Sequence, residues 1–324
     1  MPRKSKIFDV FRHFIFIKMK HNVKITSLLI SMFLITQLIG LFVISVYNNP
    51  NVTLPYGMEP PEEIQQTPQG PQIIFAFAIA ITLFFILTKF RAETFIRLWF
   101  LVVTVIALGL ALNAVMIKLN LSYYSSFLAL IIAMPLAYVK IFQRNLIVHN
   151  LTEFLIYPGI AAVFIPILNI FWIVILLLLI SIYDMWAVWH SQIMQKMAKY
   201  QIENLKFFTG FFVPYATLKQ KQKIKQIRER FANKPALLEK QFKKAKIKVS
   251  LAILGGGDII FPIITAGVFF AAYNSILPAL IIVMSATLAL LGLFILAQKG
   301  KFYPAMPFIS AGLFLGMIIN WLVF

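Results

Sequence analysis

Apolar runs long enough to cross a lipid bilayer recur along the whole chain, and they constrain its fold more than any other feature. A run of about 18 or more apolar residues is typical of a membrane-spanning helix. The composition agrees, because 60% of the 324 residues are hydrophobic and only 13% are charged. Soluble domains carry about 25% charged residues. The pattern predicts an all-α membrane protein with nine transmembrane helices. The expected spans are 25–47, 72–88, 96–117, 123–139, 151–167, 169–189, 249–270, 276–297 and 304–323.

The basic residues are unevenly divided between the two sides of the membrane. The formal net charge of +19 would suggest a nucleic-acid partner in a soluble protein. Here all of the 30 Lys and Arg residues except Lys118 lie in the N-terminal tail, in alternate loops, or at the span ends that border them. Cytoplasmic loops of membrane proteins carry such an excess. The pattern therefore predicts a cytoplasmic N-terminus, a C-terminus outside, and no nucleic-acid partner.

Composition divides the chain into four parts. We expect a cytoplasmic basic tail at 1–24, a six-helix membrane part at 25–189, a cytoplasmic basic loop at 190–248 and a three-helix membrane part at 249–324. Within the loop, the segment 207–215 is too apolar to stay in water and too short to span the bilayer. Two interpretations stay open for it: it dips into the inner leaflet or plugs a cavity, or it anchors the loop at the interface.

Two of the three aspartates lie inside apolar runs. Asp184 falls in the run from Ile170 to Trp189, and Asp258 follows three glycines in the expected span 249–270. A carboxylate in mid-membrane costs about 2.5–3.5 kcal/mol on insertion scales, so such a residue indicates a functional site. At about 1.5 Å per residue, Asp184 lies about 9 Å and Asp258 about 14 Å from the cytoplasmic ends of their helices. Adjacent antiparallel helices can therefore bring the two carboxylates together.

Two carboxylates in contact can divide the acid and base roles between them. They cannot both ionise, so one holds a proton near neutral pH. The charged group can accept a proton from water, and the neutral group can donate one to a carbonyl oxygen. This is the chemistry of peptide-bond hydrolysis without a metal or a covalent intermediate. A proton-coupled transporter or an ion channel also needs intramembrane carboxylates and is the alternative. It would favour repeated halves or paired discontinuous spans, which the sequence does not show.

The signatures of other proteases are missing from the sequence. There is no His-Glu-x-x-His of a metalloprotease and no Gly-x-Ser-x-Gly of a serine nucleophile. The four histidines lack the spacing of metal ligands, and the chain contains no cysteine. We therefore expect no metal, no other cofactor and no disulfide.

Two short motifs accompany the aspartates. The glycine triplet 255–257 lets another backbone approach closely and weakens the helix beside Asp258, although glycines alone would indicate a simple helix-packing notch. The segment 304–307 contains two prolines and is poorly suited to a helix interior. Its backbone could pair with an extended substrate. The alternative is a helix N-terminus with proline in the first turn.

Together these motifs resemble those of the presenilins and signal peptide peptidases. The matching residues are Tyr183-Asp184, Gly255-Gly256-Gly257-Asp258 and Pro304-Ala305-Met306. They are similar to the family's tyrosine–aspartate, glycine–any–glycine–aspartate and proline–alanine–leucine motifs, in the sixth, seventh and ninth expected spans. Met306 stands where the family usually has leucine, and its similar volume should be tolerated. The expected cytoplasmic N-terminus is similar to that of presenilin, whereas signal peptide peptidase is inverted. Compact loops and the lack of cysteine resemble an archaeal homologue.

The resemblance implies an aspartyl protease that cuts transmembrane helices within the cell membrane. Asp184 and Asp258 would be its catalytic pair. Tyr183 would shape the site. The glycine triplet 255–257 and the segment from Pro304 to Pro307 would help to bind the substrate. The implied substrates are single-span transmembrane proteins or signal peptides surrounded by membrane lipid. The resemblance implies no obligatory partner subunit.

Overall fold

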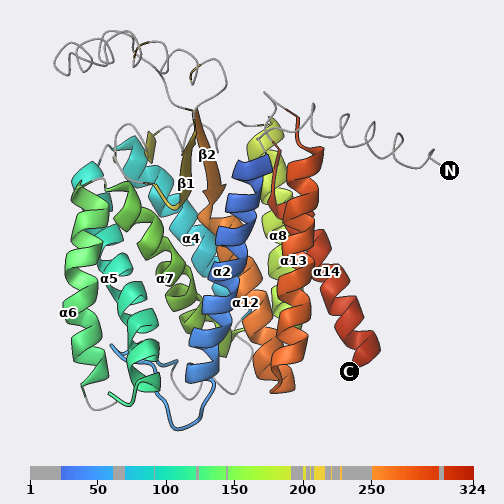
Figure 1. Ribbon diagram of the computed structural model, residues 1–324, viewed down its shortest axis with the longest axis horizontal. Helices are drawn as coiled ribbons and strands as arrows, with labels where there is room; N and C mark the ends of the chain where they lie inside the picture. The colour runs from blue at the N-terminus through green and yellow to red at the C-terminus, as the bar shows by residue number, and fades with distance from the viewer. Residues whose placement is uncertain are drawn as a thin grey trace.

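Long helices run side by side through the part of the chain that the structure describes (Figure 1). The computed structural model describes residues 23–60, 70–90, 92–121, 124–143, 145–190, 208–215, 250–298 and 303–324, together with residues 200, 201, 205, 220 and 227. The long helices are α2 (Val23–Tyr47), α4 (Gly70–Lys89), α5 (Glu93–Lys118), α6 (Ser125–Tyr138), α7 (Leu146–Phe164), α8 (Ile170–Met185), α12 (Gly256–Tyr273), α13 (Ile276–Leu296) and α14 (Met306–Val323). Short π or 3₁₀ turns continue α6 as η1 (Val139–Gln143), α7 as η2 (Ile165–Ile167) and α8 as η3 (Trp186–His190).

The predicted multi-pass membrane architecture is confirmed. Eight helices of the described residues are long and apolar enough to cross a membrane, and each coincides with one of the expected spans. The remaining expected span, 72–88, is helical as α4 but is not among these eight. The count of nine spans therefore stays a prediction.

The prediction of an uninterrupted helix over 249–270 is wrong. Residues Ser250–Gly255 form strand β2, and the helix α12 begins only at Gly256. Strand β1 (Gly210–Tyr215) pairs with β2 in antiparallel register, and the two arrows lie together at one end of the bundle (Figure 1). The physical reason is that consecutive glycines are poor helix formers, while β1 offers backbone partners to the apolar residues before them. The fold is thus mostly helical but not purely α.

The segment 207–215 contains a strand, which was not predicted from the sequence. Its described residues 208–215 contain β1, and Phe211 of this strand is fully buried. Phe211 belongs to the main hydrophobic core, together with residues of α2, α7 and α12. The strand is therefore a packed part of the bundle rather than a surface anchor.

Helix α12 lies at the centre of this core. It contacts α2, α7, α8, α13 and α14. Its residues Ile259, Ile263 and Ile264 are at most 1% exposed. Because α12 carries Asp258 in its first turn, the second membrane aspartate is placed on a helix that packs against five others.

Two of the predicted parts cannot be placed. The basic tail 1–24 lies outside the described residues except for its last two, and so does most of the basic loop 190–248. The expectation of a solvated basic segment at 219–248 falls there as well.

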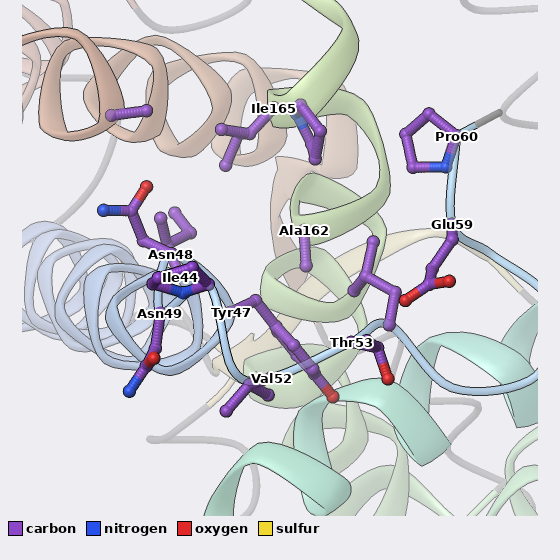
Figure 2. Close-up of a pocket in the computed structure, with 14 residues that line it drawn as sticks. Ile44, Tyr47, Asn48, Asn49, Val52, Thr53, Glu59, Pro60, Ala162 and Ile165 are labelled. Carbon is purple, nitrogen blue, oxygen red and sulfur yellow. The ribbon is translucent and has the colours of Figure 1, made fainter. Parts of the chain in front are cut away.

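A cavity of about 780 Å³ opens at the end of the bundle opposite the sheet. Its lining comes from the ends of α2 and α7, the loop 48–60 and Ala271 of α12. Figure 2 shows Tyr47 and Asn48 at the end of α2, with Glu59 on the loop. Neither membrane aspartate belongs to its lining, so this cavity is separate from the site described next.

Candidate active site

Asp184 lies in the last turn of α8 and is 7% exposed. One of its carboxylate oxygens, Oδ2, accepts a hydrogen bond of 3.0 Å from the backbone N–H of Met306, and the backbone amide of Ala305 also hydrogen bonds to this carboxylate. Met306 is the first residue of α14. The first N–H groups of a helix lack intrahelical acceptors, and the positive end of the helix dipole favours a carboxylate there. Asp184 therefore caps α14.

This cap explains the proline-containing segment 304–307. Pro304 lies before α14 and is buried, and Pro307 occupies the second position of the helix. A proline in the first turn costs nothing, because its missing N–H would have had no partner. The sequence left open whether this segment is an irregular strand-like stretch or the N-terminus of a helix. In the structure it leads into the first turn of α14. The segment aims free backbone amides at Asp184.

Asp258 also lies at a helix N-terminus. It is the third residue of α12, whose N-cap is Gly255 in an extended conformation (φ −66°, ψ 147°). The backbone amide of Gly255 hydrogen bonds to the Asp258 carboxylate, which also interacts electrostatically with Asp184. Asp258 is 9% exposed. The structure thus places the two aspartates within electrostatic range of each other, with Asp258 in the first turn of α12 and Asp184 against the first amide of α14.

The packing of three helices places the two aspartates near each other. Helix α8 contacts both α12 and α14, so Asp184 lies between the helix that carries Asp258 and the helix that it caps. Asp258 reaches this place by a different route from the one expected. It lies three residues into a helix that continues from a strand, rather than about 14 Å along a continuous helix.

The three glycines have different surroundings. A Cβ on Gly256 would lie 2.9 Å from the ring and the hydroxyl of Tyr157 in α7, closer than real Cβ contacts. A Cβ on Gly255 would lie 3.2 Å from Oδ2 of Asp258, whereas one on Gly257 would meet nothing nearer than 3.9 Å. The triplet therefore has two close neighbours: the side chain of Tyr157 beside Gly256, and the backbone of β1, where Gly210 pairs with Gly255 and Thr209 accepts a hydrogen bond from the N–H of Gly256.

Tyr183 lies next to Asp184 on α8 but is 41% exposed. Its ring centroid is 6.3 Å from that of Trp186. The ring therefore borders the site from the outer surface of the bundle. Within the part of the chain that the structure describes, the Tyr183 ring does not lie between the two carboxylates.

Sequence reasoning missed several polar residues beside the aspartates. Tyr157 is buried, its hydroxyl faces Glu153 of the same helix, and it interacts electrostatically with Asp258. Ser181, one turn before Asp184, donates a hydrogen bond of 2.8 Å to Ser310 of α14. These residues could have been found in the sequence, because each is a polar residue inside an apolar span, which is the criterion that singled out the two aspartates.

Replacing Gly256 with alanine should destabilise the protein through a clash with Tyr157. The same replacement in a Tyr157→Ser background should cost less, because the ring is gone, so the effects on the free energy of unfolding should be non-additive. Gly257→Ala is the matched control and should leave the unfolding midpoint near that of the wild type. The coupling is measured by thermal unfolding in detergent of wild type, Gly256→Ala, Tyr157→Ser and the double variant, with Gly257→Ala alongside. Strictly additive effects would show that Tyr157 does not restrict position 256.

Comparisons with known proteins agree with this geometry. The family model described as signal-peptide peptidase, presenilin aspartyl protease matches residues 30–324. Among curated proteins, none matches the sequence. Two solved structures of a presenilin family intramembrane aspartate protease, in space groups C222 and P2, are similar in fold, each with a TM-score of 0.56. They are 16% and 17% identical, and the matches cover 92% and 91% of this chain and 99% and 97% of theirs.

The family model covers far more than half of the chain, so the resemblance seen in the short motifs is confirmed. At these low identities the solved structures show the fold alone, and that fold is the one found here. The chain belongs to the signal-peptide peptidase and presenilin family and is a multi-pass intramembrane aspartyl protease.

Proposed function

We propose that Asp184 and Asp258 are the catalytic pair and that they hydrolyse peptide bonds within transmembrane helices by general acid–base catalysis. The observation that carries this proposal is the meeting of two buried carboxylates on adjacent helices. The ionised carboxylate accepts a proton from water as the water attacks the scissile carbonyl carbon. The protonated carboxyl donates its proton to the carbonyl oxygen. The carboxyl that took a proton from water then gives it to the amide nitrogen as the C–N bond breaks, and the other carboxylate accepts a proton from a hydroxyl of the tetrahedral intermediate. The new amine and the new acid then leave with the pair restored.

The segment 304–307 supports this chemistry by holding Asp184. The N–H of Met306 is already bonded to that carboxylate, so we assign it to positioning the pair rather than to pairing with substrate. Two helix N-termini then fix the orientation of the two carboxylates, which is the preorganisation that acid–base catalysis needs. Pro304, Pro307 and Tyr183 border the same place and remain proposed substrate contacts.

The substrate must lose helical structure before it can be cut, because a helix keeps its carbonyls in hydrogen bonds. Strand β2 leads directly into Gly255 and Asp258. Its edge away from β1 offers backbone groups to an extended segment, which is the strand-addition mode of peptide recognition. We propose single-span transmembrane proteins or signal peptides as the substrates, approached from surrounding lipid in a cell membrane. The compact loops and the lack of cysteine, which resemble an archaeal homologue, also favour an archaeal source.

A transition-state mimic tests the proposed pair. A peptide isostere with a hydroxyl in place of the scissile carbonyl should lie between the two carboxylates. Transition-state analogues bind about 10²-fold or more tightly than substrates, and Asp184→Asn or Asp258→Asn should remove that advantage. Competition binding to wild type and variants in liposomes measures it. Equal affinity for all three proteins would place the hydroxyl away from these carboxylates.

From the charge pattern we also propose nine spans, with the residues before the first span and the loop 190–248 in the cytoplasm. Because the number of spans is odd, Phe324 should lie on the outer face. Reporter domains fused after Phe324 and within 219–248 should therefore report opposite sides of the membrane. Reporters on the same side would contradict this topology.

A further inference from the structure

Side chains from the start of α7 occupy the edge of β1 that faces away from β2. The amide nitrogen of Asn150 donates to the carbonyl of Phe212 over 2.8 Å, and the N–H of Phe212 donates to Oδ1 of Asn150 over 3.0 Å. One side-chain amide thus supplies both a donor and an acceptor, as a residue of a neighbouring strand would. Asn150 takes the place of a third strand at Phe212.

The same edge is held again two residues earlier. His149 Nε2 lies 2.8 Å from the carbonyl oxygen of Gly210, and the N–H of Gly210 donates to Oε1 of Glu153 over 3.4 Å. Gly210 has φ +141°, and a Cβ there would lie 2.4 Å from the carbonyl oxygen of Leu254. Only glycine fits between α7 and β2 at this point. Gly210 and Phe212, two of the three β1 residues on this edge, are therefore bonded to α7, and the third, Pro214, has no N–H to donate.

A buried ion pair underlies these contacts. Lys140 of η1 forms a salt bridge with Glu153, and its Nζ lies 3.3 Å from Nδ1 of His149. Because an ammonium group can only donate, Nδ1 accepts and the proton of neutral His149 is assigned to Nε2, which donates to Gly210. Lys140 is 4% exposed and Glu153 is 1% exposed. Buried ion pairs are weak evidence for stability, because their desolvation is costly. Their oriented hydrogen bonds point to a positioning role.

We propose that His149, Asn150 and Glu153, with Lys140 as the counter-charge, are positioning residues that set the register of the sheet and so the place of Asp258. We call these four residues the α7 clamp. The inference rests on the proposed catalytic role of Asp258. It concerns how that carboxylate is held, since no residue of the clamp touches the reacting atoms.

The link from clamp to catalytic residue is short. Gly210 lies opposite Gly255, the N-cap of α12, in the β1–β2 register. The N–H of Gly256 also donates to the carbonyl of Thr209 over 3.3 Å. A shift of β1 therefore moves the start of α12, where Asp258 lies. Because side chains alternate along a strand, a slip of one residue would also turn the core residues of β1 outward.

Asn150→Leu tests the α7 clamp, because leucine has a similar size but neither donor nor acceptor. Thr152→Val is the matched control, since Thr152 lies half a turn further along α7, is 1% exposed and hydrogen bonds only to carbonyls of its own helix. Both variants and the wild type are assayed with a single-span substrate in liposomes, and the products are mapped by mass spectrometry. Hydrogen exchange at β1 and β2 is measured in parallel.

We expect Asn150→Leu to exchange the amides of β1 faster and to lose kcat by roughly 10²-fold, the loss that a misplacement of about 1 Å can cause. Its KM should change little, and its cuts should spread over neighbouring peptide bonds. Thr152→Val should match the wild type in every respect. If Asn150→Leu does not fold, Asn150→Asp is assayed instead, because it keeps the acceptor for the N–H of Phe212 and replaces the donor to the Phe212 carbonyl with a carboxylate oxygen that repels it.

Two results would overturn the inference. One is a folded Asn150 variant with wild-type kcat and a single wild-type cut. The other is a variant whose exchange in β1 equals that of the control. Failure of the proposed catalytic pair would look different. Asp258→Asn would then retain turnover, while hydrogen exchange would still report whether the clamp holds the sheet.

Discussion

Replacing Gly159 with alanine should destabilise the protein, although alanine is the better helix former. Gly159 lies where α7 crosses α5, and a Cβ there would lie 1.9 Å from the carbonyl oxygen of Ala107. That oxygen belongs to a helix backbone and cannot rotate away, so the two helices would have to separate. Overpacking costs about 1–3 kcal/mol, more than the gain of about 0.5–1 kcal/mol from removing a helical glycine. The midpoint of thermal unfolding in detergent should fall.

Gly292→Ala is the control for this prediction. Gly292 lies in α13, and a Cβ there would meet nothing within 4 Å. Its replacement should therefore keep or raise the unfolding midpoint through helix propensity alone. Equal midpoints for the two variants would contradict the close crossing of α5 and α7. Because α7 also carries Tyr157 and three of the four residues of the α7 clamp, its crossing with α5 helps to hold these groups in place.

The helices of the fold and both aspartates could be predicted from the sequence, because the bilayer requires long apolar segments and makes an intramembrane carboxylate conspicuous. The sheet could not be predicted in the same way. Its pairing of Gly210 with Gly255 joins two strands that are separated along the chain by residues 216–249. Hydropathy does not distinguish an apolar strand in a membrane protein from the end of an apolar helix. The glycine triplet was the local signal, since helix propensity is low there.

The α7 clamp was missed for two separate reasons. The fifth span was expected to begin at residue 151, whereas α7 begins at Leu146, so His149 and Asn150 were placed in a loop before that span. Lys140 was counted as a cytoplasmic loop charge, yet it is buried in an ion pair. Glu153 did lie within an expected span. It satisfies the criterion that singled out Asp184, and its partner could be known only from tertiary packing.

Asp184→Asn and Asp258→Asn should each abolish proteolysis while the protein still folds. Asparagine cannot accept a proton from water or donate one to a leaving group, so loss of either role should cost about 10²–10⁴-fold or more. Its side-chain oxygen still accepts a hydrogen bond, so the contacts with Met306 and Gly255 can persist. Removing a buried charge should leave stability unchanged or slightly raised. The two losses should be non-additive, as for groups that act as one unit.

The wild-type pH dependence should follow from the same pairing. If one carboxylate must be charged and the other protonated, cleavage should rise and then fall with pH. The two limits would belong to the pair rather than to either residue. A rate that rises with pH and never falls would show that no protonated carboxyl is needed.

The most direct test is cleavage of one single-span substrate by purified wild type, Asp184→Asn, Asp258→Asn and the double variant in liposomes. Folding of each is checked by its unfolding midpoint. Wild type should cut within the transmembrane helix of the substrate, and all three variants should be equally inactive with wild-type stability. Substantial turnover by either folded single variant would contradict the assignment of Asp184 and Asp258 as a catalytic pair.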